Sequence, residues 1–156
     1  MPRIRRQEKK PATDPATPPD GALLDSIQRA AFSYFPAKVN RANGLVSDNS
    51  RPNAPVSIAV VGFALSCYAI AVERGWLPRS DAVQLTLAAL RFFARSDQSG
   101  GPAATGFKGF YYHFLDAKTG TRVWGSELSM IDTALLLAGA FVASRYFDAD
   151  VADETE

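Results

Sequence analysis

The chain has 156 residues, of which 47% are hydrophobic, and its formal net charge is +1. This length allows one domain with a buried core. The near-zero charge excludes a bulk electrostatic attraction to nucleic acid or to an anionic membrane. Cys67 is the single cysteine, so no disulfide can form within the chain, and the sequence holds no metal-binding motif. We therefore expect neither a metal nor a cofactor.

The amino-terminal segment, residues 1–20, combines basic residues with the proline-rich stretch PATDPATPPD. This composition predicts a disordered tail, and residues 21–156 are expected to form the folded part. No apolar segment follows the arginines, so a signal peptide is not expected. The expected location is cytoplasmic, with membrane association as the alternative.

Apolar periodicity predicts a first helix over about residues 22–35 and a second over about residues 55–74. The first carries one apolar stripe and is expected to end at Pro36. The second is expected to end before Gly75, a residue suited to a helix C-terminus. Its neighbourhood, residues 54–72, holds no charge and has the length of a membrane span. Its alanines and serines favour a helix buried among other helices.

A third helix is predicted over about residues 80–95, with Ser80 as its N-cap and Asp81 in its first turn. A fourth is predicted over about residues 128–147 and is almost wholly apolar in its middle. Apolar helices thus alternate with amphipathic ones. This alternation is expected of a double ring of αα-hairpins that has its apolar helices inside.

Two long connections, residues 36–54 and 96–126, separate these helices, and long ordered loops are commonly functional. The second is predicted to contain a β-hairpin. Residues 110–115 alternate as a strand does, Asp116 to Gly120 are expected to turn, and residues 121–124 are expected to return.

Three segments together resemble the amino-terminal portion of the bacterial glycoamylase-like domain, a group associated with endo-β-1,2-glucanases of glycoside hydrolase family 144. They are NGLVSDNS at 43–50, SIAVVGFALSCYAIAVERGW at 57–76 and GFKGFYYHFLDAKTGTRVWGSELSMIDTALLLAG at 106–139. The resemblance covers about residues 22–150. It implies an all-α fold, the (α/α)6 toroid, with a glycan cleft at one end and hydrolysis by a carboxylate acid and base.

Six αα-hairpins need twelve helices, whereas the sequence predicts four. We therefore expect a partial (α/α)6 toroid of about two αα-hairpins with a small β-hairpin insertion. Such a chain is expected to be truncated and inactive on its own, because at least one essential carboxylate, the general acid, is expected beyond the fourth helix.

The candidate contacts with a glucan oligosaccharide lie in the two long loops, where aromatic rings suit the apolar faces of sugars and polar groups suit their hydroxyls. They are Asp48, Lys108, Tyr111, His113, Trp124 and Glu127. The catalytic residues stay unassigned, with Glu127 and Asp132 as the candidates. Glu127 and Asp132 are five positions apart, so they would not share one face of a helix.

Each of these residues also has a structural interpretation. Ser129 and Asp132 form the S-x-x-D pattern of a capping box, which would leave Glu127 in the loop before the fourth helix. Glu127 would then be a surface acid. His113 would be a packed, hydrogen-bonded residue, Tyr111 and Trp124 would belong to the core, and Asp48 would stabilise a turn.

Three functions remain open from the sequence. The first is a glycoside-hydrolase-like domain that acts on a β-glucan. The second is a helical interaction module that pairs through exposed apolar helices, including self-association. The third is a small membrane-associated helical protein.

Overall fold

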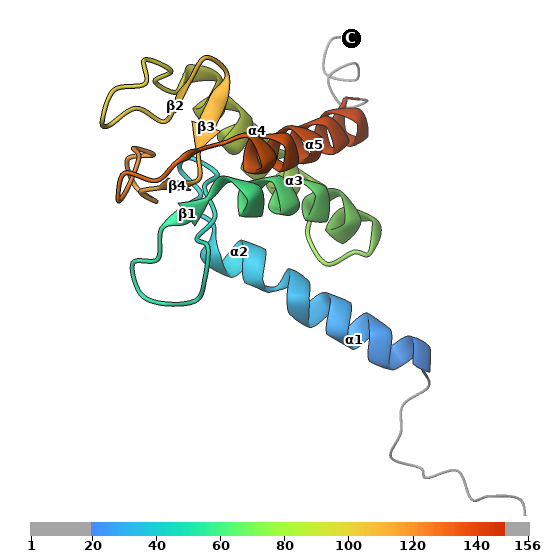
Figure 1. Cartoon of the computed structure of the whole chain (residues 1–156). Coiled ribbons are helices and arrows are strands. Elements are labelled where there is room, and N and C mark those ends of the chain that lie inside the picture. The colour runs from blue at the N-terminus through green and yellow to red at the C-terminus, as the bar shows by residue number, and fades with distance from the viewer. Residues whose placement is uncertain (1–19, 149–156) are drawn as a thin grey trace, which may run out of the picture.

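The computed structural model describes residues 20–148 as a mostly helical fold with two small antiparallel sheets (Figure 1). The predicted tail lies outside the described residues except for Asp20, which begins the first helix. The elements in chain order are α1 (Asp20–Phe32), α2 (Tyr34–Lys38), β1 (Val56–Ser57), α3 (Ile58–Glu73), α4 (Arg79–Arg95), β2 (Gly106–Phe107), β3 (Phe110–Tyr112), β4 (Phe114–Leu115), β5 (Leu128–Ser129) and α5 (Met130–Phe147).

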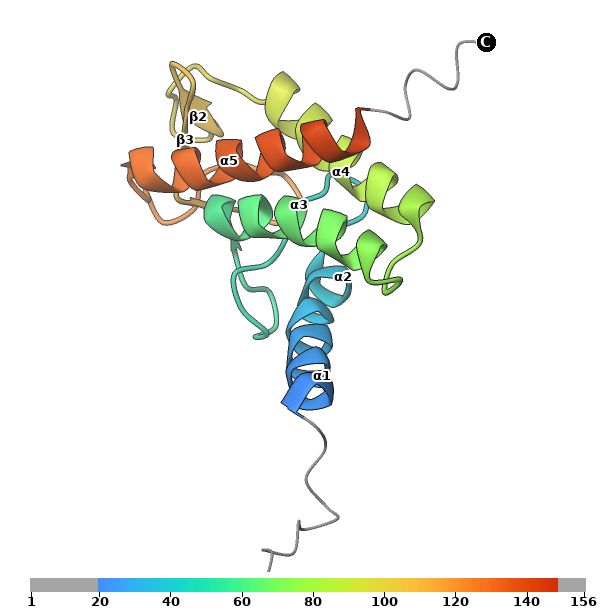
Figure 2. The ribbon, with the colours of Figure 1, turned by 90° about the vertical axis from the view of Figure 1, so that its right-hand side faces the viewer.

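Helices α3 and α5 lie side by side at the centre of the fold (Figures 1 and 2). Their backbones approach closely at Gly62 and Gly139, because a Cβ on Gly139 would lie 2.0 Å from the Gly62 carbonyl oxygen. Nine of the 16 residues of α3 are buried, and Leu65 and Tyr68 are among the most enclosed side chains. The prediction that this helix packs against other helices is confirmed.

Helix α4 flanks this pair and buries one face, as its amphipathic pattern predicts. Asp81 lies in its first turn as predicted, but the N-cap prediction is wrong because the helix begins at Arg79. Pro78 holds the N-cap position, and its carbonyl accepts a hydrogen bond from Ala82 N at 3.1 Å. Gly75 adopts φ +66° just after α3, which confirms its predicted role.

The first predicted helix is wrong in two respects. It divides into α1 and α2 at Ser33, and Pro36 lies inside α2 rather than ending it. Pro36 stands in the first turn of α2, where a helix needs no backbone N–H partner. The expected apolar stripe of α1 is not buried, since Leu24 is 60% exposed and Ile27 is 55% exposed.

Helix α1 projects away from the rest of the fold (Figures 1 and 2). Arg74, the C-cap residue of α3, ties it down through its guanidinium. One nitrogen donates to Asp25 Oδ1 at 2.8 Å, and another donates to Gln28 Oε1 at 2.8 Å.

The predicted hairpin forms in its second half, next to the turn, but its first half pairs elsewhere. The turn from Asp116 to Gly120 forms, and Leu115 bridges Arg122. The strand breaks at His113, however, into β3 and β4. Strand β3 lies between β2 and β5, and β4 pairs with β1.

The tighter hairpin joins β2 to β3 through Lys108 (φ 50°) and Gly109 (φ 87°). Two residues of positive φ suit a two-residue hairpin turn, so the chain reverses before the predicted strand begins. The break at His113 also ends the predicted alternation, because Tyr112 and Leu115, on opposite predicted faces, are both buried.

The outer face of α5 is apolar and exposed, through Met130, Ile131, Leu137, Phe141 and Val142. By length and composition, α5 is also the one helix of residues 20–148 that could cross a membrane, with mean hydropathy 1.3 and 28% of that window buried. Residues 54–72, the uncharged run with the length of a membrane span, contain most of α3, which is a shorter helix of 16 residues.

Candidate functional site

The backbone of His113 is held at the junction of β3, β4 and the start of α3. Its N–H donates to the Glu127 carbonyl at 3.0 Å, and its carbonyl accepts from Ile58 N at 3.3 Å. These two bonds fix the position from which the imidazole projects. The break between the two strands thus places the histidine of this chain beside the loop that precedes α5.

The imidazole of His113 lies between two carboxylates. Nδ1 is 2.8 Å from Glu127 Oε1, and Nε2 is 3.5 Å from Asp132 Oδ2. Glu127 precedes β5 and reaches the ring from the loop, whereas Asp132 reaches it from the first turn of α5. We call these three residues the His113 cluster. The two carboxylates orient the ring from opposite nitrogens.

Ser129 caps α5, because its hydroxyl accepts a hydrogen bond from Asp132 N at 3.2 Å. This half of the predicted capping box is confirmed. The Asp132 carboxylate faces His113, and only 14% of the side chain is exposed. Its place in the first turn of α5 also favours a negative charge there.

The hydrogen bond from His113 holds the pKa of Glu127 below its usual range, helped by the backbone N–H of Glu127 itself. Glu127 is therefore ionised near neutral pH. An ionised, exposed carboxylate can accept hydrogen bonds from sugar hydroxyls or take up a proton as a base.

Trp124 presents its indole to solvent and is linked to the His113 cluster through the ring of Phe114. The side chain is 78% exposed, and the residue has φ 55°, which is unusual for a bulky side chain. Its ring meets Phe114 edge-on at 5.6 Å, and Phe114 stacks on His113 at 3.8 Å. An exposed indole is a suitable platform for the apolar face of a sugar.

The remaining predicted contacts lie in other surroundings. The carboxylate of Asp48 accepts from Asn49 Nδ2 at 3.1 Å. The ammonium of Lys108 lies 5.1 Å over the Phe107 ring, at the tip of the β2–β3 turn. Tyr111 is half-buried, and its hydroxyl donates to the Phe93 carbonyl at 3.3 Å. Of the predicted residues, the structure brings His113, Glu127 and Asp132 into contact, and Trp124 is linked to them through Phe114.

Sequence reasoning missed the residue that braces the loop carrying Trp124. Arg122 donates to the carbonyls of Ser126 at 2.6 Å and Gly125 at 2.7 Å. Its guanidinium also lies 4.1 Å over the Tyr112 ring. No sequence motif marks this arginine, because its role depends on the fold of the loop after it. Within residues 20–148 no three His, Cys, Asp or Glu side chains are arranged to hold a metal ion.

Removing the His113 imidazole should raise the pKa of Glu127 towards that of an ordinary glutamate. The pKa of Glu127 is lower in the folded chain than in the unfolded chain. The hydrogen bond from His113 therefore stabilises the fold at pH values above the unfolded-state pKa of Glu127. This stabilisation is lost as the pH falls through the folded-state pKa of Glu127. Carboxyl-detected NMR titration of His113→Ala would measure this. Asp116 is the internal control, because backbone N–H groups of Thr119 and Lys118 lower its pKa. An unchanged Glu127 pKa in the variant would contradict the assignment.

The fold is mostly helical with small antiparallel sheets, and it is similar to solved glucoamylase-like structures. No protein-family profile matches the chain.

Over 135 residues the chain is 28% identical to an exo β-1,2-glucooligosaccharide sophorohydrolase of Parabacteroides distasonis. That match covers 83% of this chain and 18% of the relative. A β-1,2-glucanase structure from the same organism has TM-score 0.70 at 26% identity, over 85% of this chain and 19% of that one.

An endo-β-1,2-glucanase from Chitinophaga pinensis, solved with sophorotriose and glucose, shares the fold. Its TM-score is 0.64 at 18% identity, over 79% of this chain and 30% of that one. These findings confirm the resemblance to β-1,2-glucan hydrolases, over a small part of their length.

Proposed function

We propose that this chain supplies the amino-terminal helices of a β-1,2-glucan hydrolase domain, together with one wall of its glucan-binding cleft. The observation that carries the proposal is the His113 cluster, to which the Phe114 ring links the exposed indole of Trp124. The similarity to a sophorohydrolase and to β-1,2-glucanases supports the choice of substrate. In this proposal further αα-hairpins complete an (α/α)6 toroid around the exposed faces of α3 and α5.

Each residue of the site has a distinct role in this proposal. Trp124 stacks on a glucose ring, and Glu127 accepts hydrogen bonds from hydroxyls of the same or the next glucose unit. His113 is held by the two carboxylates through both ring nitrogens, and it positions Glu127 at the edge of the cleft. Asp48 and Lys108 line the cleft further out, and Tyr111 supports its wall from the core side.

Glu127, the exposed carboxylate of the His113 cluster, is not suited to be the general acid. Glycosidases use one carboxyl group that protonates the leaving oxygen and another that acts as base or nucleophile. The lowered pKa of Glu127 fits a base or a binding carboxylate and is opposite to the raised pKa of a general acid. We therefore propose that the acid comes from outside residues 20–148.

Binding to the site can be followed through Trp124 fluorescence. In a Trp76→Phe background Trp124 is the remaining tryptophan, so addition of sophorotriose should change its emission saturably. Glu127→Gln should weaken this binding about tenfold or more, because it removes a charged hydrogen-bond acceptor. Glu73→Gln, on α3 and bonded to the Tyr146 hydroxyl, is the matched control and should leave affinity unchanged. Emission that does not respond to sophorotriose would refute the role of Trp124.

The exposed apolar face of α5 favours a second function, a helical interaction module without glucan binding. That module would associate through α5 and would be indifferent to sophorotriose. For either function we propose that the protein is located in the cytoplasm, as expected from the sequence.

A further inference from the structure

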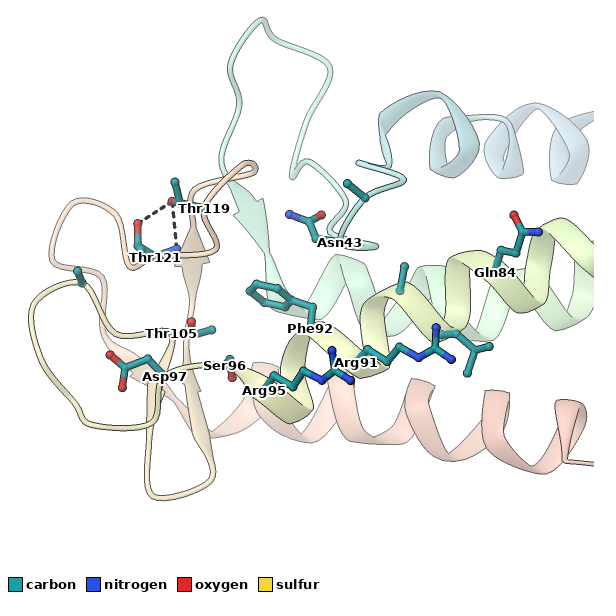
Figure 3. Close-up of a pocket in the computed structure, with 14 residues that line it drawn as sticks. Asn43, Gln84, Arg91, Phe92, Arg95, Ser96, Asp97, Thr105, Thr119 and Thr121 are labelled. Carbon is teal, nitrogen blue, oxygen red and sulfur yellow. Dashed lines mark hydrogen bonds between the residues drawn. The ribbon is translucent and has the colours of Figure 1, made fainter. Parts of the chain in front are cut away.

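A cavity lies apart from the His113 cluster, and none of the three cluster residues lines it. Its volume is about 770 Å³. It is formed by one side of α4 and by three loop segments, around residues 42–43, 96–105 and 119–121 (Figure 3). A cavity of this size fits a small organic ligand.

The walls of this cavity are fixed by close packing. Gly120 rests on the Phe92 ring, and a Cβ there would lie 2.1 Å from a ring carbon. The buried hydroxyl of Thr105 donates to the Gly120 carbonyl at 2.9 Å. On the other side, the Asn43 amide donates to the Ala117 carbonyl at 3.1 Å. The loops are thus held against α4 without a ligand.

Two arginines of α4, Arg91 and Arg95, line the cavity side by side (Figure 3). Neither forms an ion pair or a side-chain hydrogen bond with any residue of 20–148. They are four positions apart on one helix face, where like charges disfavour each other. An anion between them would relieve this repulsion.

Asp97 is the one carboxylate of the cavity lining. Its Oδ1 accepts from Ser99 N at 2.8 Å, and hydrogen bonds from Ser99 hold its pKa below the usual range. Asp97 is therefore ionised but already has a partner. The lining therefore carries two positive charges and one negative charge, which gives the cavity a net positive charge.

We propose that this cavity binds the phosphate group of a small organic molecule. A guanidinium presents parallel N–H donors that match phosphate oxygens, and two such groups stand here unpaired. The hydroxyl of Thr121 and the amide of Gln84 add polar contacts, while Leu87 and Phe92 offer apolar surface to the organic part.

NMR titration of the labelled chain with three probes tests this site. Phenyl phosphate carries both an oxyanion and an apolar ring, inorganic phosphate carries the oxyanion alone, and phenol carries the ring alone. We expect phenyl phosphate to shift the amide signals of residues 91–97 and 119–121 saturably, and phenol to leave them in place. Tighter binding of phenyl phosphate than of inorganic phosphate indicates an organic phosphate, whereas equal binding indicates free phosphate; both support an oxyanion site.

The variant R91Q/R95Q should weaken phenyl phosphate binding about tenfold or more, because both charged donors are lost. Arg145→Gln on α5 removes an exposed arginine elsewhere and should leave the affinity unchanged. Circular dichroism of each variant verifies the fold. Equal shifts with phenol, an absence of saturable shifts, or full affinity in R91Q/R95Q would overturn the proposal.

Discussion

Gly139→Ala is expected to lower the free energy of unfolding by about 3 kcal/mol, the upper end of the usual cost of overpacking. The new Cβ would meet the Gly62 carbonyl oxygen at 2.0 Å and its carbonyl carbon at 2.6 Å. Those atoms are backbone and cannot rotate away, so α3 and α5 must separate along their contact. Gly62→Ala should behave in the same way, because its Cβ would meet the Leu135 carbonyl oxygen at 2.3 Å.

Urea denaturation followed by circular dichroism measures this effect. Gly21→Ala is the matched control, since a Cβ there meets nothing within 4 Å and alanine favours a helix. That control should be neutral or slightly stabilising. If Gly139→Ala were as stable as Gly21→Ala, the close contact of α3 with α5 would be wrong.

The isolated chain is expected to self-associate and to release no sugar from β-1,2-glucan. Association follows from the exposed apolar stripe of α5, since a contiguous apolar patch above a few hundred Å² marks an interaction surface. The double variant Leu137→Lys/Phe141→Lys places charges on this stripe and should give a monomer. Light scattering after size exclusion measures the oligomeric state, and a reducing-sugar assay measures hydrolysis.

Ser144→Lys is the control for this pair, because it adds a charge to exposed α5 surface without removing an apolar side chain. It should associate as the parent chain does. A monodisperse parent chain would contradict the association. A monomer that hydrolyses β-1,2-glucan and loses that activity in Glu127→Gln would show that the chain is an enzyme by itself.

The helices at the centre of the fold were predictable from the sequence, because their apolar patterns and boundaries are local signals. Gly75 ends α3 and Asp81 lies in the first turn of α4, both as predicted. The break at Ser33 was not predictable, since Pro36 suits either the end of a helix or the first turn of the next. The exposure of α1 also depends on what surrounds it, which periodicity does not reveal.

The candidate site was predictable as a set of residues but not as an arrangement. The sequence places His113, Glu127 and Asp132 in one segment, but the five-residue spacing of Glu127 and Asp132 argues against a shared helix face. They meet because β3 pairs with β5, which brings the loop before α5 alongside the break after Tyr112. Strand pairing depends on contacts distant in sequence, and the tighter β2–β3 hairpin altered the pairing that alternation predicted.

The most direct test of the proposed glucan-binding wall is an NMR shift map in the monomeric Leu137→Lys/Phe141→Lys background. Labelled protein would be titrated with β-1,2-linked and, separately, β-1,4-linked gluco-oligosaccharides of equal length. We expect saturable shifts of the Trp124 indole, the His113 ring and the Glu127 amide with the β-1,2-linked series, and weaker shifts with the β-1,4-linked series. Unchanged signals at all three residues with the β-1,2-linked series would contradict the proposed wall.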